Sequence, residues 1–179
     1  RLAPYVLAFA LLAIHAGDRR AGLVAAAGLT FFAARTMGSI LSAKAYDDSY
    51  RAELAALDHL PRGARLISFV GRPCAEGWSV HRLDHLPSIA LVRKGAFAND
   101  QWQASGAQLL KVTYQAAGQF RSDPSQFVVA PRCERHERVA ITHALTTFPR
   151  DAFDYVWIIR QPAGPADMRG LVPVWKQGT

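Results

Sequence analysis

Residues 21–41 read AGLVAAAGLTFFAARTMGSIL, and Arg35 is the one charged residue among them. A helix of this length rises about 31 Å at about 1.5 Å per residue, which matches the roughly 30 Å hydrocarbon core of a bilayer. The sequence therefore predicts a membrane-spanning helix over this stretch. The alternative is a pair of alanine-rich helices in the core of a soluble protein.

A second apolar run, LAPYVLAFALLAIHA at residues 2–16, comes earlier and is separated from the first by the charged Asp-Arg-Arg of residues 18–20. It is a few residues short of a full span, and the chain begins inside it, so we expect the sequence to be cut from a longer protein. Together the two runs predict a transmembrane helical hairpin over residues 1–43. A signal peptide is the alternative for the first run, but charges and a longer apolar run follow it instead of a small-residue cleavage site.

Charged residues orient the expected hairpin. Short loops rich in Lys and Arg stay in the cytoplasm, and Arg19 and Arg20 occupy the tight loop between the two runs. We therefore expect the chain beyond residue 44 to lie on the outer side of a bacterial inner membrane, in the periplasm. Arg35 then either contacts a lipid phosphate near the outer leaflet, or the span ends near Ala34 and the arginine reaches back to the interface.

The length and composition of the chain indicate one water-soluble domain after the hairpin. Of the 179 residues, 21 are Lys or Arg and 14 are Asp or Glu, which gives a net charge of +7. We expect a connecting amphipathic helix over residues 44–60 and a single α/β domain over residues 61–179, which is long enough for one hydrophobic core. No run of five like charges occurs, which argues against nucleic-acid binding. A positive domain beside a bilayer suits anionic headgroups or a phosphorylated lipid, although a solvated basic face has the same composition.

The chain contains two cysteines, Cys74 and Cys133. Thiols stay reduced in the cytosol but can pair in the periplasm. Since the charges already place this domain outside, a disulfide between the two cysteines is the companion expectation. Two unrelated buried cysteines remain the alternative.

Hydrophobic patterning after residue 60 predicts an α/β domain with a mixed sheet and flanking helices. A helical pattern covers residues 134–148 and ends before Pro149, and Pro173 makes the last expected strand a candidate for the sheet edge. Short apolar or alternating runs predict strands at residues 64–70, 88–93, 108–114, 126–130, 154–160 and 171–175.

Three side chains are candidates for contacting a ligand. Arg93 and Lys94 follow one of the expected strands, and open α/β sheets bind ligands at the carboxyl ends of their strands, so this pair is a candidate for binding a lipid phosphate. Trp102 lies in an expected loop and is a candidate for stacking on a sugar. The alternatives are ordinary surface charge for the first two and a place beside the core for the tryptophan.

A metal site is a weaker hypothesis. His81 and His85 would share one face of a helix, and the two cysteines with His136 could complete a zinc site. The spacings match no common zinc module and Pro87 interrupts the helix, so the sequence predicts neither a metal nor a cofactor. It also contains no glycine-rich phosphate loop and no G-x-S-x-G motif of serine hydrolases.

Four segments carry a resemblance to a known class of proteins: LPRGARLISFVG at residues 60–71, HLPSIALVRKGAF at 85–97, GAQLL at 106–110 and FDYVWII at 153–159. They resemble the C-terminal part of bacterial polytopic inner-membrane proteins, grouped with the mannosyltransferase-like glycosyltransferases that use polyprenyl-phosphate sugars. The resemblance covers about residues 45–160. It implies a bundle of spanning helices followed by a periplasmic α/β domain, with the catalytic acidic residues in an early loop that this chain lacks, so it assigns no catalytic residue here.

The preferred hypothesis is therefore the C-terminal membrane hairpin and periplasmic accessory domain of an inner-membrane protein such as a lipid-linked-sugar glycosyltransferase. Its partners would be membrane lipid, a polyprenyl-phosphate sugar and the upstream part of the same polypeptide. One alternative is a non-enzymatic envelope protein whose outer domain binds a protein partner. Another is a metal-binding periplasmic module.

Overall fold

The computed structural model describes residue 6 and residues 18–75, 81–103, 106, 109–135 and 138–177. The chain divides into two units, residues 1–48 and residues 49–179. The first run of the expected hairpin lies outside the described residues except for Val6, so the structure shows one long apolar helix and the hairpin stays a prediction.

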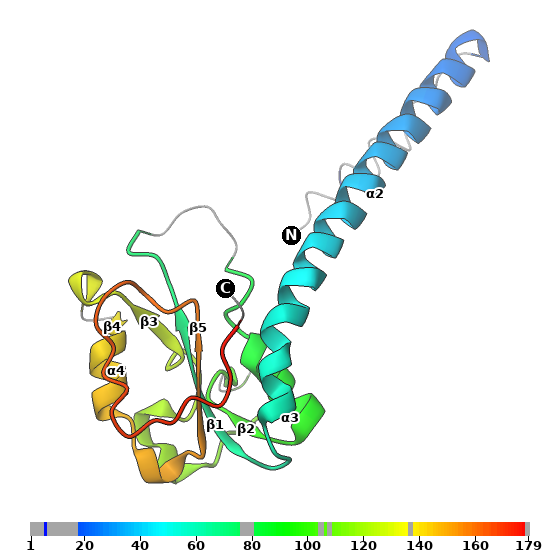
Figure 1. Ribbon diagram of the computed structural model, residues 1–179. Helices are drawn as coiled ribbons and strands as arrows, with labels where there is room; N and C mark the ends of the chain where they lie inside the picture. The colour runs from blue at the N-terminus through cyan, green and yellow to red at the C-terminus, as the bar shows by residue number, and fades with distance from the viewer. Residues whose placement is uncertain are drawn as a thin grey trace. The chain divides into compact units, whose positions relative to one another are not determined.

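That helix, α2 (Asp18–Leu54), is continuous over the predicted span at residues 21–41 and is drawn in blue to cyan in Figure 1. Its apolar part has a mean hydropathy of 1.4, and no part of it is buried. Phe31 and Phe32 are both exposed, although successive helix residues point about 100° apart. By length and composition this helix is able to cross a membrane, and its apolar surface is not restricted to one side.

The second unit is built on a sheet whose central strand is β1 (Arg65–Gly71). Along one edge β1 pairs with β5 (Tyr155–Ile159), and along the other it pairs first with β2 (Phe97–Ala98) and then with β3 (Phe127–Val129). The fifth strand, β4 (Val139–Ala140), pairs with β3. Each of these pairs is parallel, so the carboxyl ends of the strands point the same way.

Helices cover both faces of this sheet. Figure 1 shows α4 (Ile141–Thr147) on one face and α3 (Ile89–Lys94) with the last turns of α2 on the other. Short 3-10 helices join these elements: Ala55–His59, Leu86–Ser88, Gln115–Phe120, Pro131–Cys133 and Arg150–Ala152. The expected connecting helix over residues 44–60 is thus helical from α2 into Ala55–His59.

Alternation along β1 supplies two separate cores. Leu66 and Val70 pack in the core beneath α3 and the end of α2, while Ile67 and Phe69 pack in the core beneath α4. A parallel sheet buried on both faces needs such a nearly continuous apolar strand. The sequence RLISFVG satisfies that need, with Ser68 as the single polar exception.

The α/β class with helices flanking a sheet is confirmed. In the described residues the antiparallel pairing is limited to one isolated bridge between Arg135 and Arg138. The strands predicted at residues 64–70, 126–130 and 154–160 are confirmed as β1, β3 and β5.

The strand predicted at residues 88–93 is wrong, because this segment forms α3. Pro87 precedes it in the position that favours a helix start, and Gly95 ends it with a left-handed φ of 61°. Leu91 and Val92 are consequently exposed and do not enter the sheet.

Three further boundaries differ from expectation. Residues 109–114 and 171–175 form no strand, and no neighbouring strand pairs with either segment in the described part of the chain. The helix predicted over residues 134–148 is reduced to α4, because Val139 and Ala140 pair with β3 and hold the backbone extended until residue 141.

Candidate functional site

The carboxyl ends of three parallel strands meet at one edge of the sheet. Val70 pairs with Ile159 of β5 and with Phe127 of β3, so Arg72, Arg160 and the segment after Val129 leave the sheet together. Ligands of open α/β sheets bind at this edge, because the loops that follow the strands surround a crevice there. The register in which β1 pairs with β3 and β5 therefore determines which loops lie together and can form a site.

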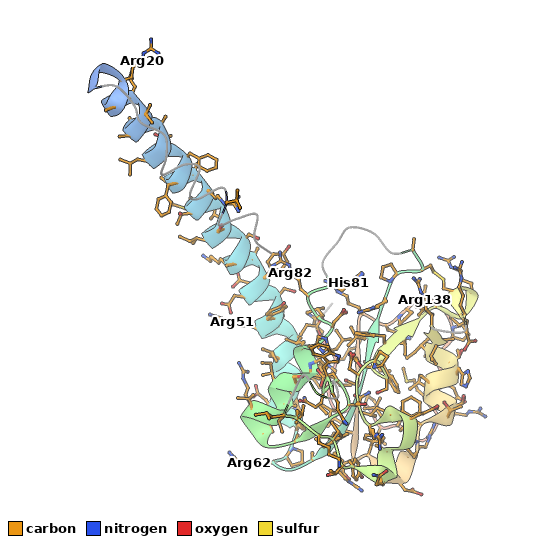
Figure 2. All side chains as sticks on the ribbon, turned by 180° about the vertical axis from the view of Figure 1, so that it is seen from behind. Arg20, Arg51, Arg62, His81, Arg82 and Arg138 are labelled. Atoms are coloured by element: carbon orange, nitrogen blue, oxygen red, sulfur yellow. A yellow bond between two sulfur atoms is a disulfide. The ribbon has the colours of Figure 1, made fainter. Side chains whose placement is uncertain are left out.

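A groove of about 570 Å³ lies at this edge. Such a volume falls within the roughly 300–1,000 Å³ typical of small-molecule sites. Figure 2 places the labelled His81 and Arg138 at this end of the second unit and Arg62, on the turn before β1, at the opposite end. The lining residues come from the three loops and from the segment near His81: Gly71, Arg72, Pro73, Cys74, His81, Ala130, Arg132, Arg160, Pro162 and Ala163.

The floor of the groove depends on Gly71. A Cβ atom at this position would lie 1.8 Å from the carbonyl oxygen of Arg160 and 3.0 Å from Cδ of Pro162, so no side chain fits there. Arg160 itself has a φ of 50°, in the left-handed region that non-glycine residues rarely adopt. Strained backbone of this kind gathers at functional sites, where it fixes a side chain in an unusual direction.

Arg72 is held in place at the groove. Its guanidinium forms an ion pair with Asp84, and its Cζ lies 3.4 Å from the centroid of the Phe127 ring in a cation–π contact. Its Nε is buried and has no acceptor in the described part of the chain. The carboxylate thus fixes this guanidinium and compensates part of its charge.

The other two arginines of the groove are less compensated. Burial raises the pKa of Glu53, and the positive charge of Arg160 opposes part of that rise, so this carboxyl group interacts electrostatically with Arg160. Arg132 forms no ion pair with any described residue and is exposed. The three guanidinium groups thus outnumber the two carboxyl groups that interact with them, and the groove has an excess of positive charge.

A disulfide closes one side of this site. Cys74 and Cys133 are joined, with their Cα atoms 5.3 Å apart and a separation of 59 positions in the sequence. The bond connects the loop after β1 to the loop after β3, and Arg138 donates a hydrogen bond of 2.6 Å to the carbonyl oxygen of Cys74. Two of the three loops that line the groove are therefore fixed to each other.

A second polar cluster, deeper in the domain, has a structural role. The side chain of Asn99 accepts from the backbone N–H of Ser68 at 2.7 Å and donates to its carbonyl oxygen at 3.2 Å. These two bonds take the place of strand pairing for the backbone of Ser68, at the point where the neighbour of β1 on this edge changes from β2 to β3. Next to it, burial raises the pKa of Asp100, and the bonds from Ser88 oppose that rise.

The predicted ligand residues lie elsewhere. Arg93 and Lys94 are in the last turn of α3 and do not follow a strand, because the segment before them is helical. Trp102 is 56% exposed in the segment after β2, and Arg35 is exposed on α2 in the first unit. None of these four side chains lines the groove.

The expected metal ligands are also dispersed. Both cysteines are in the disulfide, Nδ1 of His85 donates a hydrogen bond of 3.1 Å to the backbone carbonyl oxygen of Asp100, and His136 lies outside the described residues. Among the residues that the structure describes, no three His, Cys, Asp or Glu side chains gather in a group that could hold a metal ion.

Sequence reasoning missed Arg72, Arg132 and Arg160. Each follows a strand by one to three residues, which is the same signal that we applied to Arg93 after its supposed strand. The signal becomes specific only when the pairing of the strands is known, because many basic residues follow apolar runs.

Comparison with protein-family models, with curated proteins and with solved structures finds no match to this chain. Function is therefore argued from the groove, the disulfide and the apolar helix.

Proposed function

We propose that this chain is the membrane segment and the periplasmic accessory domain of a bacterial inner-membrane protein. The observation that carries the proposal is the exposed apolar surface of α2 over residues 21–41, which surrounds the helix. Contiguous apolar surface of this extent is rare on proteins in water, whereas lipid is a suitable solvent for it.

Two further observations support the outer location of the second unit. Arg19 and Arg20 precede the apolar stretch, and basic residues remain on the cytoplasmic side of a span. The Cys74–Cys133 disulfide suits an oxidising compartment such as the periplasm.

The intact protein is proposed to be a glycosyltransferase that uses a lipid-linked sugar, with its catalytic residues outside this chain. The resemblance of the segments at residues 60–71, 85–97, 106–110 and 153–159 supports this class. In that role the domain covers the membrane-side active site and helps to bind the acceptor or the lipid phosphate. Arg35 is then a candidate contact of that phosphate, and Arg35→Gln is expected to reduce use of the lipid-linked donor by the intact enzyme; unchanged activity excludes the contact.

Reporter fusions after residue 179 test the location. Alkaline phosphatase folds to an active enzyme only in the periplasm, and green fluorescent protein exported in unfolded form does not become fluorescent there. We expect an active phosphatase fusion and a dark fluorescent fusion. The reverse pair of results would place the domain in the cytosol and end the proposal.

A second candidate is a non-enzymatic envelope protein whose outer domain binds a protein partner. Exposed apolar side chains on the second unit favour it, namely Leu91 and Val92 on α3 and Val172 in the C-terminal segment. A sugar-transfer assay on the intact protein distinguishes the candidates, because only the first predicts turnover of a polyprenyl-phosphate sugar.

A further inference from the structure

The groove at the carboxyl edge of the sheet concentrates positive charge that the packing of the domain does not use. Neither Arg132 nor Arg160 forms an ion pair with a described residue, and Arg160 interacts electrostatically with the partly buried Glu53. Arg72 is already positioned by Asp84 and by the ring of Phe127. Three arginine residues from three different loops thus line one groove.

We propose that this groove binds a phosphate or diphosphate group, with Arg132 and Arg160 as its principal ligands and Arg72 as the fixed third contact. Guanidinium groups donate paired hydrogen bonds in a planar fork that matches the oxygen atoms of a phosphate. Three such groups from different directions suit a tetrahedral oxyanion better than a planar carboxylate, which a single guanidinium can saturate.

The backbone at the groove supports the same assignment. Without a side chain at Gly71, the floor stays open between the ends of β1 and β5. The left-handed backbone of Arg160 orients its side chain away from the ordinary direction of a strand residue, and the Cys74–Cys133 disulfide fixes the two loops that carry Arg72 and Arg132. The binding groups are therefore preorganised, which lowers the entropic cost of binding.

Two sources can supply this chemistry, a lipid headgroup and a soluble phosphate compound. The groove is present wherever the domain lies in the cell. Phosphate binding can therefore be shown or refuted independently of the proposed function. The experiment must therefore measure binding of a free anion and of a lipid phosphate separately.

Isothermal titration of the full chain in phosphatidylcholine nanodiscs with inorganic diphosphate tests the first source. Arg132→Gln and Arg160→Asn are each expected to weaken binding about tenfold, the effect of losing one charge-assisted hydrogen bond. Asparagine is chosen at position 160 because it tolerates the left-handed backbone better than most other non-glycine residues. Arg62→Gln is the matched control, since it removes a positive charge at the opposite end of the sheet.

Hydrogen exchange in nanodiscs with and without phosphatidic acid tests the second source. A lipid phosphate in the groove is expected to protect the backbone of residues 71–75 and 130–133, and Arg132→Gln is expected to abolish this protection. Circular dichroism and thermal unfolding verify that each variant is folded.

Weakened diphosphate binding in both groove variants, or lost protection in Arg132→Gln, with Arg62→Gln unchanged, supports the proposal and identifies the source of the phosphate. Equal losses in all three variants would show a response to net charge alone and overturn it. So would a wild-type chain that neither binds diphosphate nor gains protection from phosphatidic acid.

Discussion

Phe31 and Phe69 are the same residue type in two different environments. Phe31 is 70% exposed on α2 in the first unit, whereas Phe69 is fully buried on β1 in the second, with ring centroids of Phe120 and Phe148 at 6.1 and 6.0 Å. In the second unit the protein itself removes apolar surface from water. Around residues 21–41 the described residues provide no such cover, and the length and composition of the stretch match the apolar core of a bilayer.

The largest expected change in stability is at Phe69, and Phe31 is its matched control. Phe69→Ala should lower the free energy of unfolding of the second unit by about 3–5 kcal/mol, since it removes a large buried side chain and leaves a cavity. Phe31→Ala should change the same quantity by less than about 0.5 kcal/mol, as is usual for exposed positions. Urea unfolding in detergent, followed by tryptophan fluorescence, measures both. Equal losses would show that the apolar part of α2 at residues 21–41 belongs to the same packed core.

The disulfide should have the next largest effect. The double variant Cys74→Ala, Cys133→Ala should destabilise the second unit by about 2–4 kcal/mol, because the unfolded chain regains the freedom that a loop closed over 59 positions removes. A reducing agent should lower the stability of the wild-type domain by a similar amount and leave the double variant unchanged. A wild-type domain whose unfolding is insensitive to reduction would contradict the role of this bond.

A smaller effect is expected at the amino end of β1, opposite the groove. Arg65 donates to Asp154 through its side chain and through its backbone N–H, and these bonds lower the pKa of Asp154 from 3.8 to about 2. The stabilisation from this pair is therefore complete above pH 4 and is lost as the pH falls towards 2. Because both side chains are partly exposed and screened, it amounts to about 1 kcal/mol or less.

Asp154→Asn tests this pair. The variant should be less stable than the wild type at pH 7, and the difference should shrink between pH 4 and pH 2 in urea unfolding experiments. A difference that is the same at both ends of this range would show that the charge of Asp154 is not responsible.

The smallest effect is expected at Arg35. Arg35→Gln should leave the free energy of unfolding of the second unit unchanged within about 0.5 kcal/mol, because the residue is exposed in the first unit. Urea unfolding with Arg62→Gln as a surface control measures the change. A loss above 1 kcal/mol would mean that the two units share interactions on which folding depends.

The contrast between the units also explains what the sequence could predict. Strands β1, β3 and β5 were predictable because a parallel strand buried on both faces needs a nearly continuous apolar run, and LISFV, FVV and YVWII provide one. The run IALVR has the same composition, and only its flanking Pro87 and Gly95 indicate a helix. Short apolar runs are ambiguous because composition alone does not distinguish a buried strand from a short helix.

The groove could not be predicted in the same way. Its arginines are separated by dozens of residues, and they meet only because β1 pairs with β3 and β5 in the observed register. Pairing between distant strands is decided by how two cores pack on the sheet, which no local pattern in the sequence records. The disulfide was easier to anticipate, since a chain with two cysteines allows only one intramolecular pairing.

Cysteine labelling in intact membranes tests most directly whether lipid is the solvent of the apolar part of α2. The two native cysteines are in a disulfide, so a single new thiol can be introduced at Phe31→Cys and, in a second variant, at Asp58→Cys. A water-soluble maleimide should modify position 58 in both intact and detergent-dissolved membranes after outer-membrane permeabilisation, and position 31 only when the membrane is dissolved. Equal modification of both positions in intact membranes, or recovery of the wild-type chain in the soluble fraction, would contradict a bilayer around α2.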